Sequence, residues 1–395
     1  MQIGSFSLIK ELNTSIILKT IRNNNSISRA DISKLTGLTP ATVTNITSEL
    51  LSYKLISETK LGKSNGGRKP VLLSFCYNEY NTIGVVIAKH RIIATLTDLN
   101  ANIIKQQLIN IDSDISPNTA MNHIITSIKN LTSNNKKKLL GIGVSIEGLV
   151  DEKKGICVFS NNFGWENVEI KKILSETFSI PVYVDNDVKA LALGENFFGS
   201  AKTINDFILL YVGYGIGLCI VNNGQIYRGS SNYASEFGHT IIDANGPQCS
   251  CGNKGCFQAL ASGGALIKKA KSLNYDTKYF NGDDMTVDKI IEYANNGNDK
   301  LYELINEQSK YISIGLANII NIFNPSLIII NGDICKINDS IKESIIENSG
   351  KMCLKNTKDD AVITFSKLSL KEAYKGAVAL LVANIFENPE SFFNH

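Results

Sequence analysis

The spacing of hydrophobic residues along this chain changes near residue 80. Before that point, apolar residues recur at the period of amphipathic helices. The pattern predicts three helices, over residues 8–22, 29–35 and 40–51. Ser28 and Thr39 stand where helix N-caps are expected, Pro40 takes the first helical position, and Gly37 follows the second helix as a stop signal. A helix, a short turn containing glycine and a second helix predict a helix-turn-helix.

Two short strands are predicted next, over residues 55–58 and 70–73, and a basic segment over residues 62–69 joins them. Helices followed by such a hairpin are typical of a winged helix-turn-helix DNA-binding domain, which we expect over residues 1–78. The third helix turns short polar side chains outward, where they can reach base edges and phosphates. The predicted DNA contacts are Arg29, Thr39, Thr42, Thr44, Asn45, Ser48, Lys63, Arg68 and Lys69.

Positive charge is concentrated in this N-terminal part. Residues 1–70 hold seven Lys and three Arg against one Asp and three Glu, a net charge of +6; the whole chain carries +3, so the remainder carries −3. Such asymmetry is expected where one module meets a polyanion. Arg68 would suit the narrow minor groove of A·T-rich DNA, where negative potential is enhanced. The alternative is a small helical domain with a charged, solvated linker.

After residue 80, strands and helices alternate along the chain, which is typical of an α/β architecture. Strands are predicted over residues 83–87, 92–97, 103–109 and 139–145, and helices over residues 121–131, 188–197, 311–323 and 373–386. The last two helices have apolar faces that either dimerise or pack on a sheet. The pattern leaves both interpretations open.

Length and composition predict a globular protein of two or three domains, since the chain has 395 residues and is 43% hydrophobic. No window reaches about 18 uninterrupted apolar residues, and the N-terminus lacks the pattern of a signal peptide. We therefore expect a cytoplasmic protein without a membrane partner. In that reducing compartment, five scattered cysteines are expected to be buried thiols. They are Cys76, Cys157, Cys219, Cys335 and Cys353.

One histidine and three cysteines are spaced as metal ligands. His239, Cys249, Cys251 and Cys256 follow the pattern His-x9-Cys-x-Cys-x4-Cys. Zinc is commonly bound by four such nitrogen and sulfur ligands at tetrahedral corners. Glycines lie inside the cysteine loop, where a backbone that folds tightly around a metal needs residues tolerant of positive φ. The sequence predicts a structural zinc site that braces a loop beside a pocket; the alternative is a coincidence of scattered thiols.

Several motifs together resemble the ROK family, which groups sugar-responsive repressors with sugar kinases. The resemblance covers nearly the whole chain. Its motifs are Ser28-Arg29-Ala30-Asp31, Leu38-Thr39-Pro40-Ala41-Thr42-Val43, Gly66-Gly67-Arg68-Lys69-Pro70, Asn186-Asp187, Gly213-Tyr214-Gly215-Ile216-Gly217, Glu236-Phe237-Gly238-His239 and the cysteine loop. The family implies an α/β fold: a winged helix-turn-helix followed by a two-lobed, actin-like (ribonuclease-H-like) domain of the sugar-kinase type. The expected lobes are residues 79–190, completed by 373–395, and residues 191–372, which carry the zinc loop.

The resemblance also implies a sugar pocket between the lobes. Its residues would be Asn161, Asn186, Asp187, Glu236, His239 and Gln258. Carboxylates and side-chain amides can bind two neighbouring sugar hydroxyls and reject analogues that leave them unpaired. From the residues alone, Asn186 and Asp187 could instead be a helix cap, and Glu236 a solvated loop carboxylate. Trp165 packs either near the pocket or in the core.

Three departures from the family pattern bear on activity. In the kinases a glycine-rich turn near the first strand cradles ATP phosphates and Asp187 would be the base; here that turn reads Val86-Ile87-Ala88-Lys89-His90, so we expect no catalysis and a vestigial Asp187. The second loop keeps its glycines around Tyr214 but could be a plain tight hairpin. Gln258 and Glu147 stand where the family usually has glutamate and proline, which puts the identity of the sugar in doubt.

The sequence thus predicts a repressor of carbohydrate-utilisation genes that a sugar releases from a palindromic operator. Its partners would be double-stranded DNA, a small sugar and further copies of the chain, as a homodimer or a dimer of dimers. One alternative is an ATP-dependent sugar kinase with a DNA-binding appendage. Another is a DNA-binding regulator with a degenerate sugar pocket, controlled by a protein partner.

Overall fold

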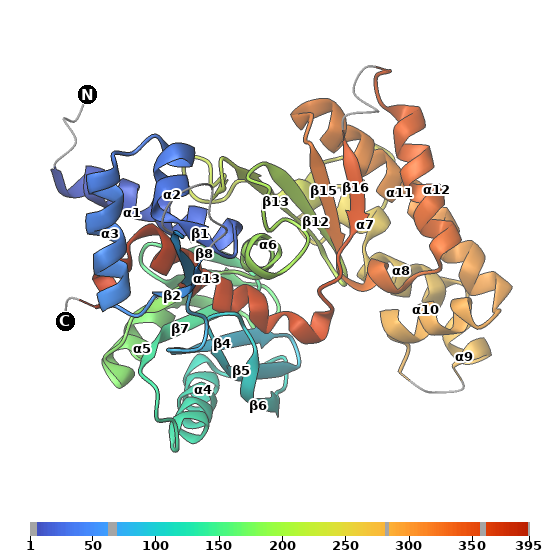
Figure 1. Ribbon diagram of the computed structural model, residues 1–395. Coiled ribbons are helices and arrows are strands. Elements are labelled where there is room, and N and C mark those ends of the chain that lie inside the picture. Colours follow the sequence, from blue (N-terminus) through green and yellow to red (C-terminus); the bar gives the residue numbers. More distant parts are fainter. Residues whose placement is uncertain (1–5, 62–68, 281–283, 356–360, 394–395) are drawn as a thin grey trace. The chain divides into compact units, whose positions relative to one another are not determined.

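The computed structural model describes residues 6–61, 69–280, 284–355 and 361–393 (Figure 1). The chain divides into two compact units. The first combines Met1–Phe198 with Ala373–His395, and the second is Gly199–Glu372. Within the described residues, no helix combines the length and apolar character that crossing a membrane requires.

Three helices and a small sheet open the first unit. The elements are α1 (Phe6–Asn23), β1 (Ile27–Ser28), α2 (Arg29–Thr36), α3 (Pro40–Ser52), β2 (Ile56–Leu61) and β3 (Val71–Phe75). Ser28 accepts a hydrogen bond from the backbone N of Asp31, and Thr39 accepts one from Thr42, so both act as the predicted caps. Gly37 ends α2 with a φ of 72°. The three predicted helices are confirmed, and the strands form a sheet in the order β1-β3-β2.

A five-stranded sheet in the order β11-β7-β4-β5-β6 forms the centre of the rest of this unit. Its strands are β4 (Asn81–Ala88), β5 (Arg91–Asp98), β6 (Ile103–Asn110), β7 (Leu139–Ile146) and β11 (Val182–Asn186). The strands β4, β5 and β6 are antiparallel neighbours, whereas β7 runs parallel to β4 and β11 parallel to β7. A smaller sheet contains β8 (Leu149–Asp151), β9 (Ile156–Ser160) and β10 (Trp165–Val168). The predicted alternation of strands and helices is confirmed.

Helices complete the first unit. They are α4 (Pro117–Thr132), α5 (Ile170–Phe178), α6 (Asp187–Phe198), α13 (Tyr374–Glu387) and the short η4 (Pro389–Phe392). The helix α13, red in Figure 1, packs on β4 and β7 and against α6. Buried residues of α1 and α3 share one hydrophobic cluster with α13. The C-terminal helix therefore packs on a sheet, which settles the alternative left open by its apolar face.

The second unit is built on a five-stranded sheet in the order β14-β13-β12-β15-β16. Its strands are β12 (Phe207–Val212), β13 (Ile216–Asn222), β14 (Gln225–Ile226), β15 (Leu327–Asn331) and β16 (Val362–Phe365). Its helices are η1 (Phe237–His239), α7 (Phe257–Ala261), α8 (Gly263–Ser272), α9 (Tyr275–Tyr279), α10 (Val287–Asn295), α11 (Asp299–Phe323), η2 (Asp333–Lys336), α12 (Asp339–Met352) and η3 (Leu370–Glu372). One large apolar cluster fills this unit.

Some details differ from the sequence predictions. The first unit ends at Phe198 rather than at residue 190, because α6 packs against α13 in that unit. The eight cysteines, all within the described residues, form no disulfide; Cys157 and Cys219 are buried as predicted, but Cys76, Cys335 and Cys353 are only half-buried. Trp165 is 2% exposed in the core, and its indole N–H donates to the Ile115 carbonyl oxygen at 2.9 Å. The three half-buried cysteines were expected in the core because their neighbours in sequence are apolar, and those neighbours do not reveal partial exposure.

Candidate ligand, metal and DNA-contact sites

Two residues assigned to sugar binding lie where α6 begins. The Asn186 side-chain oxygen accepts hydrogen bonds from the backbone N of Val188 at 3.0 Å and of Lys189 at 3.2 Å. One carboxylate oxygen of Asp187 also accepts from Val188 N, at 2.9 Å. Both side chains are half-buried. They therefore do cap the helix, and the cap holds two polar groups in fixed directions, as a ligand site requires.

A second carboxylate, Glu147, lies close to these residues at the end of β7. The Asn186 amide donates to the Gly148 carbonyl oxygen at 3.1 Å, and the Asn162 amide donates to the Glu147 carboxylate. Limited hydration and repulsion from Asp187 raise the pKa of Glu147 to about 7, although the Asn162 hydrogen bond opposes the shift. Glu147 thus places a second carboxyl group next to Asp187, where the family usually has proline.

The turn between β9 and β10 supplies a residue that the sequence reasoning missed. The predicted Asn161 is exposed in this turn, and its neighbour Asn162 contacts Glu147. The only sequence signal was the Asn161-Asn162 pair itself, since the partner lies on another element. Asn162 is therefore, like Asn161, a candidate ligand-binding residue of the first unit.

The predicted zinc ligands converge in the second unit. One ligand atom from each of His239, Cys249, Cys251 and Cys256 lies within 4.8 Å of all the others. The Cys249 sulfur is 3.7 Å from His239 Nδ1, and the sulfurs of Cys251 and Cys256 are 3.6 Å apart. Ligands about 2.3 Å from a tetrahedral zinc ion would be separated by about 3.8 Å. The cluster fits a metal ion both in its donor atoms and in their spacing.

Glycines let the cysteine loop close around this cluster. Gly252 and Gly255 have φ values of 96° and 68°, in the left-handed region. A Cβ on Gly255 would lie 1.5 Å from the Asp243 carbonyl oxygen, so no other residue fits there without movement. The backbone N of Cys249 donates to the Asn253 carbonyl oxygen at 2.8 Å and closes the turn. The predicted role of glycine in the loop is confirmed at both positions.

The other residues that the resemblance assigns to sugar binding lie on either side of the cysteine loop in the sequence. Glu236 is exposed and precedes η1, while His239, at the end of η1, is half-buried. Since Nδ1 of His239 faces Cys249, its other ring nitrogen lies on the opposite side of the ring. The side-chain oxygen of Gln258 accepts from the backbone N of Ile216 at 3.2 Å. Gln258 therefore links the cysteine loop to the glycine-rich hairpin between β12 and β13.

That glycine-rich hairpin is tightly held. Gly213 N donates to the Gly215 carbonyl oxygen at 3.0 Å, and Gly263 N at the start of α8 donates to the Gly213 carbonyl oxygen at 2.7 Å. Tyr214 projects outward and is 55% exposed. The tight-hairpin interpretation is thus confirmed for the backbone of this loop.

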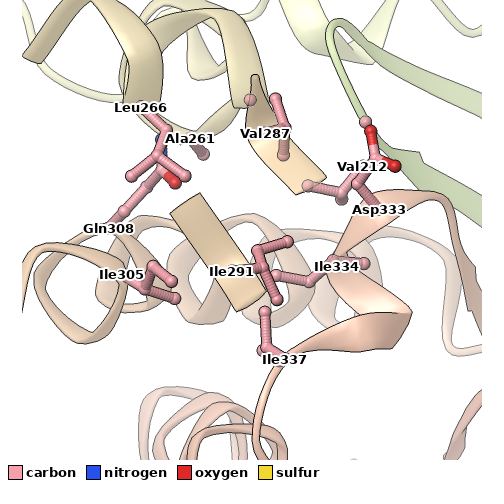
Figure 2. Close-up of a pocket in the computed structure, with 12 residues that line it drawn as sticks. Val212, Ala261, Leu266, Val287, Ile291, Ile305, Gln308, Asp333, Ile334 and Ile337 are labelled. Carbon is pink, nitrogen blue, oxygen red and sulfur yellow. The ribbon is translucent and has the colours of Figure 1, made fainter. Parts of the chain in front are cut away.

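A cavity beside Gly213 is small and apolar (Figure 2). Its volume is about 20 Å³, and Ile291, Ile305, Ile334 and Ile337 contribute to its lining. A single water molecule needs about 10–15 Å³. The cavity is therefore far too small for a nucleotide base.

Residues 86–90, which the resemblance matches to the first phosphate-binding turn of the kinases, form the end of β4 and the turn to β5. Ala88 of β4 pairs with Arg91 of β5, so Lys89 and His90 form a two-residue hairpin turn. The Lys89 side chain is half-buried, and its charge lowers the pKa of Glu147, although burial and Asp187 have the larger, opposite effect.

Most of the predicted DNA contacts lie on or near α3. Thr39, Thr44, Asn45 and Ser48 are exposed and Thr42 is half-buried. The Thr44 hydroxyl donates to the Pro40 carbonyl oxygen and the Ser48 hydroxyl to that of Thr44, both at 2.8 Å, which leaves each hydroxyl able to accept.

The other predicted DNA contacts lie outside α3. Arg29 forms an ion pair with Glu58 at 3.0 Å, and its Nε donates to the Thr47 hydroxyl. Lys69 is exposed, whereas Lys63 and Arg68 lie outside the described residues.

Comparison with known proteins places the architecture in a class. The ROK family model matches residues 82–384. A solved ROK family transcriptional regulator, described as a homolog of the E. coli MLC protein, has a TM-score of 0.85 at 25% identity and covers 96% of this chain and 97% of its own. A ROK family glucokinase from Streptomyces griseus, solved with glucose and AMPPNP, has a TM-score of 0.65 at 25% identity and covers 76% of this chain and 98% of its own. The fold is therefore the mixed α/β, actin-like fold that ROK kinases also have.

The chain belongs to the ROK family. The xylose repressor of Caldicellulosiruptor bescii is 33% identical to it in an alignment 397 positions long, which covers 98% of this chain and 99% of that protein. The similarity thus extends over nearly the whole chain, the N-terminal helices included, whereas the glucokinase covers 76% of it. The resemblance inferred from the sequence motifs is confirmed.

Proposed function

We propose that this protein is a sugar-responsive, DNA-binding transcriptional repressor. The observation that carries this proposal is the end-to-end similarity to a xylose repressor, helices α1–α3 included. A sugar kinase needs no such N-terminal module. The regulated genes would be those of carbohydrate utilisation, and a chromosomal operator as partner implies a cytoplasmic protein.

The N-terminal helices and hairpin would act as a winged helix-turn-helix. In this proposal α3 enters the major groove, with Thr42, Asn45 and Ser48 near base edges. The net charge of +6 over residues 1–70 supports contact with phosphates. Arg29 would act indirectly, since its ion pair with Glu58 fixes α2 against β2. Lys63, Arg68 and Lys69 would form the wing, and two copies of the chain would read a palindrome.

The sugar would be bound by residues from each unit. The proposed contacts are Asn161, Asn186 and Asp187 of the first unit and Glu236, His239 and Gln258 of the second. Xylose is the first candidate because the named relative is a xylose repressor. A sugar that prefers the arrangement with low DNA affinity must weaken operator binding, and about 100-fold weakening corresponds to about 2.7 kcal/mol.

The metal cluster would hold structural zinc. His239, Cys249, Cys251 and Cys256 supply the neutral imidazole and thiolate ligands that zinc prefers. Bound zinc would fix the orientation of the His239 ring, whose second nitrogen could then meet a sugar hydroxyl. The site would therefore link the fold of the loop to the ligand site without taking part in chemistry.

The rival function is an ATP-dependent sugar kinase, which Asp187 keeps open. The Lys89-His90 hairpin turn, which replaces the glycine-rich turn of the kinases, speaks against nucleotide binding. Sugar-dependent ATP turnover that Asp187→Asn abolishes would support the kinase. A third candidate, a regulator controlled by a protein partner, is favoured by Glu147 and Gln258, which depart from the family's sugar site.

The deciding experiment measures operator binding by fluorescence anisotropy. An operator is first selected from random DNA, and its affinity is then measured with xylose, glucose, N-acetylglucosamine and their phosphates. We expect one sugar, xylose first, to weaken binding about 100-fold. Failure to select any sequence would overturn the proposal, and tight binding that every sugar leaves unchanged would favour the protein-partner alternative.

Two variants of α3 test the DNA contacts. Asn45→Ala removes an exposed amide in the middle of the helix and should weaken operator binding about 5- to 100-fold, since one good base contact is worth about 1–3 kcal/mol. Ser52→Ala, an exposed position at the end of the same helix, is the matched control and should bind as the wild type does.

A further inference from the structure

The helix α6 joins the candidate sugar site to the end of the first unit. It starts at Asp187, directly after Asn186, and ends at Phe198, the last residue before the second unit. Its 12 residues correspond to a rod about 18 Å long. A ligand that shifts the start of α6 therefore acts on a rigid helix. The other end of this helix is the last residue of the chain before the second unit.

One arginine of the N-terminal module contacts that other end. Arg22, in the last turn of α1, donates from Nη2 to the Asn196 carbonyl oxygen at 2.7 Å. The last carbonyl groups of a helix have no partner within the helix, and the helix dipole is negative there. A guanidinium from a distant part of the chain thus caps the C-terminal end of α6.

Aromatic rings fix the orientation of this guanidinium. Its central carbon lies 4.2 Å from the centre of the Phe197 ring and 5.5 Å from that of Phe386 in α13. Phe386 stacks on Phe75 at 5.0 Å, and Phe75 packs edge-on against Tyr77 at 4.8 Å. The guanidinium of Arg22 therefore contacts both α6 and α13, and its position depends on where both helices lie.

Burial makes this contact sensitive to small shifts. Loss of hydration lowers the pKa of Arg22, and interaction with the nearby Tyr77 opposes that change. A charge removed from water depends on its hydrogen-bond partners, so displacement of the Asn196 carbonyl removes one of the hydrogen bonds that stabilise the guanidinium. The contacts of Arg22 with Asn196 and Phe197 therefore stabilise the observed position of the end of α6.

The helix that carries Arg22 is packed onto the proposed DNA-reading helix. Ile17 and Ile21 of α1 share a buried cluster with Val43 and Leu50 of α3. Lys10 of α1 also pairs with Glu49 of α3 at 2.9 Å. A shift of α1 that follows a change in the Arg22 contacts would therefore also shift α3.

We propose that Arg22 couples sugar binding at the start of α6 to operator binding through α3. Arg22 is a positioning residue, because it is itself neither a proposed sugar contact nor a proposed DNA contact. Coupling of this kind requires an element whose position both sites bias, and α6 is that element. The inference rests on the proposed repressor function and specifies how the two sites communicate.

The test compares Arg22→Met and Arg22→Lys with the wild type. Lysine keeps the charge but lacks the planar, forked group that stacks and donates in a fixed direction. Operator affinity is measured with and without the sugar that releases the wild type, and sugar affinity is measured by calorimetry with and without operator. Because coupling is reciprocal, both pairs of measurements must give the same factor.

We expect the coupling factor to fall from about 100-fold to about threefold or less in both variants, while sugar affinity without DNA stays within about threefold of the wild type. Arg91→Met, which removes an exposed arginine at the start of β5, should leave the factor unchanged. If Arg22→Met fails to fold, Arg22→Lys decides. Unchanged coupling in a folded Arg22 variant overturns the inference alone, whereas a wild type that no sugar affects overturns the proposed function and the inference with it.

Discussion

Gly143 of β7 lies so close to Ala377 of α13 that a Cβ on Gly143 would be 1.8 Å from the Ala377 carbonyl oxygen. Gly376, the preceding residue of α13, meets α6 in a similar way: its Cβ would be 2.8 Å from the carbonyl carbon of Ala190. Glycines thus allow α13 to touch both the sheet and α6. This close packing holds the first turn of α6 against α13, whereas Arg22 contacts the other end of α6 at Asn196.

We expect Gly143→Ala to lower the free energy of unfolding by about 3 kcal/mol or more, because the methyl group must push α13 away from the sheet. Gly376→Ala should cost less, about 1–3 kcal/mol, since its nearest contact is longer. Urea denaturation of both variants gives the comparison. Equal stability of Gly143→Ala and the wild type would mean that α13 packs farther from β7 than described.

The N-terminal helices could be predicted from sequence because their signals are local. Ser28, Gly37 and Thr39 act within a few residues of where they stand. The start of α11 was missed: the helix was predicted over residues 311–323 but begins at Asp299, capped by Asn298. Leu301, Leu304 and Ile305 are buried at helical spacing there, but charged neighbours obscured the pattern.

Long-range contacts of the site left no such signal. The hydrogen bond from Arg22 reaches Asn196, 174 residues away, and nothing near Arg22 in the sequence indicates that partner. The same holds for the Asn162 contact with Glu147. The cluster of His239 and three cysteines was predictable because the cysteines lie in one short loop, so their spacing alone constrains the geometry.

The metal site gives a separate prediction. Elemental analysis should find about one zinc per chain, and Cys251→Ser should lose it together with thermal stability of the second unit. Cys353→Ser is the matched control: Cys353 is half-buried in the same unit, outside the cluster, and its loss should leave zinc content unchanged. Full zinc content in Cys251→Ser would remove Cys251 from the ligand set.

An ion pair at α1 should contribute modestly to stability. Lys10 pairs with Glu49 at 2.9 Å and with Glu390 at 2.6 Å, and hydrogen bonds to Glu390 and Glu49 raise its pKa. Since the three side chains are partly exposed, Lys10→Met should cost up to about 1 kcal/mol at low salt and less at high salt. Lys172→Met, in a more exposed pair with Glu169, should cost nothing measurable.

The pH dependence of the Lys10 contribution has a definite sign. A lysine whose pKa is raised on folding stabilises the folded state at neutral pH, and this stabilisation is lost as pH rises above the ordinary lysine pKa of about 10.4. The difference in unfolding free energy between wild type and Lys10→Met should therefore shrink at strongly alkaline pH. A difference that stays constant from pH 7 upward would show that the methionine acts through packing rather than charge.

Two neighbouring variants separate the capping role at the start of α6 from the proposed ligand role. Asn186→Ala removes the acceptor for Val188 N and Lys189 N, so it should lower stability by about 1 kcal/mol and also weaken sugar binding. Asp187→Asn keeps an oxygen that can accept from Val188 N, so stability should stay within about 0.5 kcal/mol.

Sugar affinity of Asp187→Asn should nevertheless fall about 10- to 100-fold, because a hydrogen bond to a charged group is worth about 1.5–3 kcal/mol. Denaturation and calorimetry on the same samples give both quantities. If Asp187→Asn binds sugar as the wild type does, Asp187 serves only to cap α6, and the proposed sugar contacts of the first unit reduce to Asn161 and Asn186. If Asp187→Asn is as stable as the wild type but binds sugar more weakly, Asp187 contacts the sugar. The ligand then acts on α6 at its first residue.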